Sequence, residues 1–104
     1  MSKVSVVIPM YNSEKTIEQV LGSVISQTAI SEIAEIIVVD DGSTDSSALL
    51  VEEFIRTHPT SSILLIRQPN GGVSSARNHG IRIAKGEYIA LLDSCLLYTS
   101  PSPR

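Results

Sequence analysis

Residues 36–45 read IIVVDDGSTD, in which four β-branched apolar residues run directly into two aspartates and a glycine. A short, unbroken apolar run is typical of a strand buried on both faces, as strands of parallel sheets are. Asp40 and Asp41 follow the run and open a polar loop that continues to Thr44. The stretch therefore predicts a strand over 36–39 with two carboxylates at its carboxyl end.

The same order of apolar run, polar loop and helical stretch recurs on both sides of this segment. Further strands are predicted over 4–8, 63–66 and 88–92, with Pro9 ending the first because it cannot donate to a ladder. Apolar residues at helical spacing predict three intervening helices. Their expected core faces are Ile17, Val20, Leu21, Val24 and Ile25; Leu50, Val51, Phe54 and Ile55; and Val73, Ala76, Gly80, Ile83 and Ala84.

This alternation of strands and helices determines the expected fold class. Strand–helix–strand units imply right-handed crossovers and a mostly parallel α/β sheet. Pro59 lies just beyond the second predicted helix, and Gly86 is expected as the C-terminal glycine of the third.

Composition limits the class of protein. A length of 104 residues suits one small domain, and 42% hydrophobic residues with 18% charged residues are an ordinary globular balance. The net charge of −3 argues against nucleic-acid binding. No signal peptide precedes the first strand and no apolar run approaches the roughly 20 residues of a membrane span, so a cytoplasmic protein is expected.

The last ten residues, CLLYTSPSPR, differ in character from the rest of the chain. They show neither helical nor alternating periodicity, and they can be read as a frayed, proline-rich terminus. They can also be back-translated into a sequence that resembles a transposon-type sequencing adapter read in one frame. We therefore expect a domain over residues 1–94 and a non-native tail over residues 95–104, with no cysteine in the natural segment.

Polar residues follow each predicted strand, at the edge where ligands bind in open α/β sheets. They are Tyr11 and Asn12 after the first strand, Asp40 and Asp41 after the second, Asn70 after the third, and Asp93 after the fourth. We expect these side chains to converge on one site.

Four segments, VSVVIPMYN (4–12), IIVVDDGSTD (36–45), NGGVSSARNHG (70–80) and GEYIALLD (86–93), resemble the family 2 glycosyltransferases in order and spacing. The resemblance covers essentially all of residues 3–94. It implies a Rossmann-like GT-A fold and transfer of a sugar, with inversion, from a nucleoside diphosphate sugar, most simply UDP-linked, to an acceptor hydroxyl. It also implies that this chain is an inactive, nucleotide-binding N-terminal part whose catalytic base lies in missing sequence.

The resemblance assigns roles to several site residues. Asp41 would accept the imide N–H of uracil, whereas Asp40 can equally cap the following loop as an Asx-turn. The ring of Tyr11 would line the base pocket, with packing as the alternative. Pro9 would shape the turn in which Asn12 is also counted as substrate-binding.

Arg77 is expected near the start of the third helix, where it would pair with the diphosphate. An ion pair with Asp93 or Asp41 is the structural alternative. His79 and His58 are expected to be surface residues of helices.

Asp93 is the expected metal ligand. The family carries Asp-x-Asp at this strand end, where carboxylates hold Mn²⁺ or Mg²⁺ and the ion holds the diphosphate. Here the third position is Cys95, a poor ligand for a hard divalent ion, so the site is incomplete.

Other functions and partners remain open. A nucleotidyltransferase would need a glycine-rich basic loop after the first strand, and residues 9–13 contain neither glycine nor a cation. A receiver-like, non-catalytic module would need a phospho-acceptor Asp after the third strand, where Arg67 stands instead. The acceptor of a transferase could be a glycan, a lipid or a polysaccharide precursor, and a longer protein could be membrane-associated.

Overall fold

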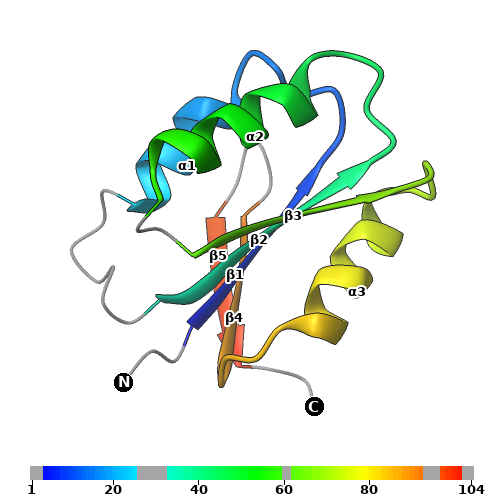
Figure 1. Cartoon of the computed structure of the whole chain (residues 1–104). Helices are drawn as coiled ribbons and strands as arrows, with labels where there is room; N and C mark the ends of the chain where they lie inside the picture. Colours follow the sequence, from blue (N-terminus) through cyan, green and yellow to red (C-terminus); the bar gives the residue numbers. More distant parts are fainter. Residues whose placement is uncertain (1–3, 26–32, 60–61, 93–96, 102–104) are drawn as a thin grey trace.

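The computed structural model describes residues 4–25, 33–59, 62–92 and 97–101, which form one twisted sheet between two layers of helices (Figure 1). The elements, in chain order, are β1 (Val4–Met10), α1 (Ile17–Ile25), β2 (Ile33–Asp41), α2 (Ser47–Thr57), β3 (Ile63–Gln68), α3 (Val73–Ile83), β4 (Tyr88–Leu92) and β5 (Leu97–Pro101). The strand order is β3-β2-β1-β4-β5. The first four strands are parallel, and β5 pairs antiparallel with β4.

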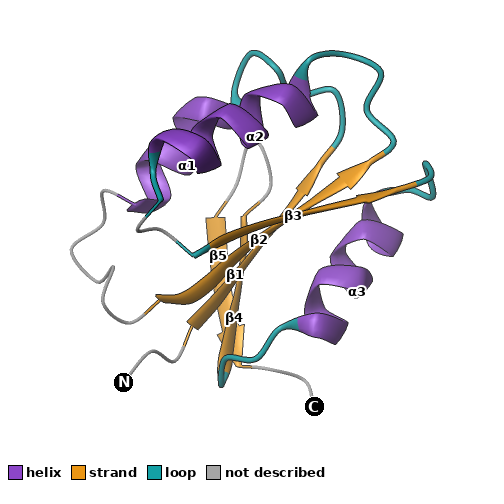
Figure 2. Cartoon of the chain, in the orientation of Figure 1, coloured by secondary structure: helices purple, strands orange, loops and turns teal. Residues whose placement is uncertain are grey.

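The helices are divided between the faces of the sheet. Figure 2 shows α1 and α2 together on one face and α3 alone on the other. The first two crossovers lead to a neighbouring parallel strand, whereas the third leads from β3 past β2 and β1 to β4, which pairs parallel with β1. The parallel sheet agrees with the alternating pattern of the sequence. No helix among the described segments is long and apolar enough to cross a membrane.

Two apolar clusters fill the space between these layers, because successive residues of a strand point to opposite faces. On β1, Val6, Ile8 and Met10 belong to the cluster under α1 and α2, whereas Val7 belongs to the cluster under α3. The predicted core faces of α1 and α2 are confirmed, since every residue assigned to them is buried or packs against the first cluster.

Helix α3 approaches the sheet closely at Gly80. A Cβ at this position would lie 2.4 Å from Cγ1 of Val7 and 3.4 Å from Cγ2 of Val39. Only glycine therefore allows this separation between helix and sheet, which sets the position of the whole α3 segment.

The central strands extend further toward their carboxyl ends than predicted. β1 continues through Pro9 to Met10 because its described ladder with β4 ends at Val7, so among the described strands Pro9 pairs with β2 alone. β2 includes Asp40 and Asp41, which the apolar pattern alone places in the following loop.

Two expectations at the C-terminal end are wrong. Helix α3 ends at Ile83 with an extended residue, Ala84, at its C-cap, so Gly86 is not a helix-terminating glycine. Gly86 is instead buried, and its N–H donates to Oγ of Ser5 at 2.8 Å. The periodicity predicts no regular element after Ser94, whereas Leu97–Pro101 forms β5.

Candidate functional site

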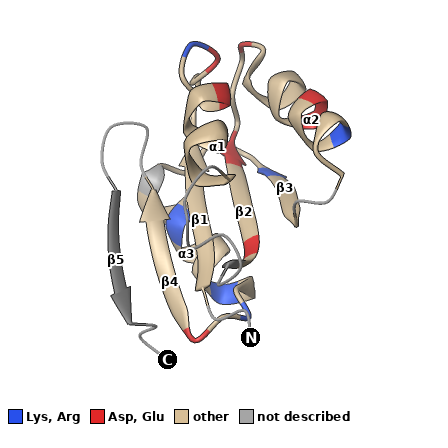
Figure 3. Cartoon of the chain, turned by 90° about the vertical axis from the view of Figure 1, so that its left-hand side faces the viewer, with Lys and Arg blue, Asp and Glu red and all other residues tan. Residues whose placement is uncertain are grey.

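The carboxyl ends of β1, β2 and β3 and the loops over 11–16, 42–46 and 69–72 lie at one edge of the sheet, here called the carboxyl edge. The register aligns Met10 with Asp40, Asp40 with Arg67, and Asp41 with Gln68. In Figure 3 the acidic end of β2 stands beside a basic position on β3. The expected convergence of these three strand ends is therefore present.

Asp41 occupies the centre of this edge and is held by four donors. Its Oδ1 accepts from the N–H of Gly71 at 2.8 Å and from Nε2 of Gln68 at 2.9 Å. Its Oδ2 accepts from the N–H of Gly72 at 2.9 Å and, at the long distance of 3.5 Å, from Nδ2 of Asn70. The carboxylate thus ties β2 to the loop that leads into α3.

These contacts determine the protonation of Asp41. Burial alone would raise the pKa of this carboxyl, but the hydrogen bonds from Gly71, Gln68 and Gly72 stabilise the ionised form and together outweigh it. The pKa of Asp41 therefore lies below its usual value, and the group is a carboxylate at neutral pH.

Asp40 points to the opposite face of the sheet, as the alternation along β2 requires. It is fully buried, and its Oδ1 accepts from the N–H of Ser43 at 3.0 Å, so the loop-capping alternative for this residue is realised. Nε of the exposed Arg67 lies 3.4 Å from Oδ2, near enough for an ion pair, although Oδ2 accepts no hydrogen bond among the described residues. The two adjacent aspartates therefore do not share one pocket.

The loops after β1 and β2 are joined by reciprocal hydrogen bonds. Asn12, with φ of 47°, donates its N–H to Oγ of Ser43 at 2.9 Å and accepts the N–H of Thr44 at 2.8 Å. The N–H of Glu14 donates to the Asp45 carboxylate at 3.3 Å, and Oε1 of Glu14 accepts from the N–H of Ser46 at 2.9 Å. We call this set of contacts the loop staple.

The loop staple determines what its members do. Ser43 and Thr44 are not caps of α2, because they bind Asn12, whereas Asp45 accepts from the N–H of Ser47 in the first turn of α2 at 2.9 Å. The helix α1 begins only at Ile17, and the side chain of Asn12 is directed to the neighbouring loop rather than to α1.

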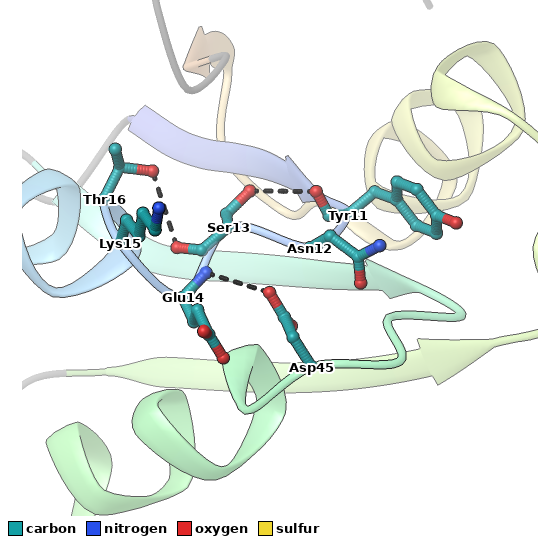
Figure 4. A pocket seen from close by; sticks show the side chains of 7 residues that line it. All are labelled: Tyr11, Asn12, Ser13, Glu14, Lys15, Thr16 and Asp45. Atoms are coloured by element: carbon teal, nitrogen blue, oxygen red, sulfur yellow. Dashed lines mark hydrogen bonds between the residues drawn. The ribbon is translucent and has the colours of Figure 1, made fainter.

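A polar pocket of about 420 Å³ lies beside the staple (Figure 4) and is lined by Tyr11, Asn12, Ser13, Glu14, Lys15, Thr16 and Asp45. Tyr11 stands at one end of it, with its ring directed away from Glu14 and Asp45. Its side chain is 51% exposed, so Tyr11 is not a core packing residue. Pro9 is buried within β1 and contributes backbone shape rather than a side chain at the surface.

Arg77 and His79, both on α3, differ in whether they have a side-chain partner among the described residues. Arg77 is half-buried and forms no ion pair with any described residue, so the alternative pairing with Asp41 is not realised. His79, expected on the helix surface, is in fact half-buried, and its Nδ1 lies 2.8 Å from Oε1 of Gln68. His58 packs its ring on Phe54 and has a structural role.

The expected metal ligand, Asp93, and the neighbouring Cys95 lie outside the described residues. Within the described ranges, no three His, Cys, Asp or Glu side chains gather in a way that could hold a metal ion. The carboxyl edge as described therefore offers hydrogen-bonding groups but no metal centre of its own.

Sequence reasoning missed Gln68 and Arg67 as members of the edge. Both lie beyond the predicted end of the third strand, and β3 in fact extends to Gln68. Their positions follow from the pairing of Asp40 with Arg67 and of Asp41 with Gln68, and this register cannot be read without the structure.

Comparisons with known proteins agree with this arrangement. Residues 5–99 match the family described as glycosyl transferase family 2. A poly(ribitol-phosphate) beta-glucosyltransferase from Bacillus spizizenii is 44% identical over 92 residues, which cover 88% of this chain and 14% of that protein.

Solved structures show the same fold. TarS from S. aureus, in complex with UDP-GlcNAc, has a TM-score of 0.77 at 37% identity, over 88% of this chain and 26% of that one. The mannosyltransferase PcManGT from Pyrobaculum calidifontis, in complex with GDP-Man and Mn²⁺, has a TM-score of 0.83 at 31% identity, over 88% and 27%. The expected GT-A fold is confirmed, and the chain spans between 14% and 27% of the length of these relatives.

Proposed function

The chain belongs to glycosyl transferase family 2, and we propose that its carboxyl edge binds the uridine diphosphate part of a nucleotide-sugar donor. The observation that carries the proposal is the hydrogen bonding of Asp41. A carboxylate offers about four acceptor positions, and Gly71, Gln68 and Gly72 occupy three of them at 2.8–2.9 Å. The fourth, on Oδ2, has only the 3.5 Å contact with Asn70, and it suits the single imide N–H of uracil.

Access to this oxygen involves Asn70. Asp41 is only 3% exposed, whereas Asn70 is exposed and its amide lies over Oδ2. The Asn70 amide also donates to the backbone carbonyl oxygen of Asp41 at 3.0 Å, and it keeps this bond in the proposed complex. The uracil N–H replaces only the 3.5 Å contact of Asn70 with Oδ2, and it forms a charge-assisted hydrogen bond there. The exposed ring of Tyr11 supplies a flat apolar surface for the base.

The diphosphate is assigned to Arg77 and the N-terminal end of α3. Arg77 has no anionic partner among the described residues, and the helix end favours negative charge. Asp93 would add its carboxylate to a Mn²⁺ or Mg²⁺ site in the longer protein. A Mn²⁺ complex is known for PcManGT, and within this family it supports the use of a divalent ion.

In the longer protein, an acceptor hydroxyl would attack the anomeric carbon of the sugar as the bond to the diphosphate breaks. The product would have inverted configuration, and the hydroxyl proton would pass to a carboxylate outside this chain. The relative that glucosylates poly(ribitol-phosphate) favours a glycan or polymer acceptor. Residues 1–104 alone are proposed to bind nucleotide without transferring sugar.

Calorimetric titration of the chain with UDP, uridine, GDP and N3-methyl-UDP tests the proposal. UDP should bind more tightly than uridine because of the diphosphate, and more tightly than N3-methyl-UDP because the methyl group removes the N–H that Asp41 accepts. Equal binding of UDP and N3-methyl-UDP would contradict the role of Asp41. Tighter binding of GDP would contradict the choice of uridine.

A matched pair of arginine variants tests the diphosphate site. Arg77→Gln should reduce the preference for UDP over uridine by about tenfold, the scale of one charge-assisted contact. Arg82→Gln, an exposed change in the last turn of the same helix, should leave that preference unchanged. The same loss in both variants would point to bulk charge rather than to a site at Arg77.

A further inference from the structure

A chain of hydrogen bonds runs from α3 through β3 to Asp41. Nδ1 of His79 lies 2.8 Å from Oε1 of Gln68, and Nε2 of Gln68 donates to Oδ1 of Asp41 at 2.9 Å. Nε2 also donates to Oγ of Ser75 at 3.3 Å. Gln68 is the last residue of β3 and His79 lies in the second half of α3, so three elements meet in this chain.

The chemistry of the three groups fixes the direction of every bond in it. A carboxylate only accepts, so Gln68 must present its NH₂ group to Asp41. Its carbonyl oxygen then faces His79, and a carbonyl also only accepts. His79 must therefore carry a proton on Nδ1, and the histidine determines which way round the Gln68 amide stands.

We propose that Gln68 and His79 are positioning residues that direct Oδ2 of Asp41 toward the nucleobase. Gln68 and the N–H of Gly71 use Oδ1 fully, which fixes the rotation of the carboxylate about its Cβ–Cγ bond. Oδ2 is then the oxygen with an acceptor position to spare. This role rests on the proposed function, because it concerns the recognition of the uracil N–H.

An isosteric pair of variants at position 79 tests the direction of the hydrogen bonds between His79, Gln68 and Asp41. His79→Asn keeps a donor close to the position of Nδ1, so UDP affinity and the preference for UDP over N3-methyl-UDP should stay within about twofold of the original. His79→Asp places an acceptor there, turns the Gln68 amide around and brings its carbonyl oxygen against Asp41. We expect UDP affinity to fall about tenfold, with most of the preference over N3-methyl-UDP lost.

A second measurement does not depend on nucleotide. The carboxyl carbon of Asp41 can be followed by NMR during an acid titration of the whole chain. Its midpoint should rise in His79→Asp and in Gln68→Met, which removes the donor, and should not move in His79→Asn. The nitrogen shifts of His79 should show the Nδ1–H form in the original chain.

The outcomes separate this role from the function on which it rests. If the unsubstituted chain binds UDP but His79→Asp changes neither the nucleotide preference nor the Asp41 titration, the positioning role is overturned and the proposed function stands. If the unsubstituted chain does not bind UDP, both are overturned. A thermal transition of His79→Asp like that of His79→Asn, together with a selective loss of UDP preference, is the result that we expect.

Discussion

The side-chain oxygen of Asn12 accepts a hydrogen bond from the backbone N–H of Thr44 at 2.8 Å, although 32 residues separate the two. This contact joins the turn that carries Tyr11 to the loop that follows Asp41. The two proposed base-binding residues are therefore held by one connected loop structure rather than by two independent loops. Because the two loops are already held together, less conformational entropy is lost at this edge when a nucleotide binds.

The first prediction concerns the loop staple itself. Asn12→Ala loses the bond to Thr44 and places an alanine at φ of 47°, so the free energy of unfolding should fall by about 2 kcal/mol. Asn12→Gly loses the same bond but tolerates positive φ, and it should lose only about 1 kcal/mol. Urea denaturation of both variants measures the difference, and equal losses would show that the backbone at Asn12 is not strained.

The second prediction tests the close approach of α3 to the sheet. Gly80→Ala should lower the free energy of unfolding by roughly 1–3 kcal/mol because its Cβ meets Val7. Gly22→Ala is the matched control, since a Cβ there meets no atom of the described residues within 4 Å and should raise stability by roughly 0.5–1 kcal/mol. Truncation of Val7 to Ala should recover part of the Gly80→Ala loss, and additive losses would contradict the contact.

The third prediction concerns pH. Because the pKa of Asp41 is lowered in the folded chain, the ionised group adds stability that is complete above its usual pKa of 3.8. That stability is lost as the pH falls through the lower folded pKa. Asp45 acts in the same direction: burial would raise its pKa, but hydrogen bonds from Ser47 and Glu14 lower it.

Denaturation between about pH 2 and pH 6 should therefore show stability decreasing with acid below about pH 4. Asp41→Asn should be less stable at neutral pH and should show a shallower acid dependence, with the contribution of Asp45 remaining. Glu52→Gln removes one negative charge from an exposed residue, as Asp41→Asn does from a buried one, and should keep the original dependence of stability on pH. An unchanged slope in Asp41→Asn would mean that Asp41 is not the group whose ionisation stabilises the fold.

The fourth prediction uses two exposed tyrosines as a pair. Tyr11 is 51% exposed at the carboxyl edge, and Tyr88 is 43% exposed at the amino end of β4. Tyr11→Ala should weaken UDP binding by about tenfold, as expected for loss of one base-stacking surface, and Tyr11→Phe should retain most of the affinity. Tyr88→Ala should have no effect. A similar loss at both positions would argue against stacking at Tyr11.

Much of the architecture could be predicted from periodicity. A short run of β-branched residues indicates a buried strand, and an apolar stripe at helical spacing indicates a helix that packs its apolar face on the sheet. The limits of the strands could not. Pro9 stays within β1 because the ladder on its β4 side has already ended at Val7, which depends on the relative lengths of two strands distant in sequence.

The candidate site, too, could be predicted from the sequence only in part. The strand ends converge as the parallel sheet requires, but the partners of Asp41 come from the loop before α3 and from the extended end of β3. The separation of Asp40 from Asp41 follows from the alternation of a strand, once both residues are known to lie inside β2. The loop staple consists of backbone N–H groups meeting short polar side chains, for which the sequence carries no periodic signal.

Binding of the uridine nucleotide at the carboxyl edge is tested by the amide chemical shifts of the chain, measured while UDP is added. We predict saturable shifts at Tyr11, Asp41, Gly71, Gly72 and Arg77, with little change at Ser5 and Lys85 at the opposite end of the strands. Shifts confined to the opposite end, or none at any UDP concentration, would contradict the claim.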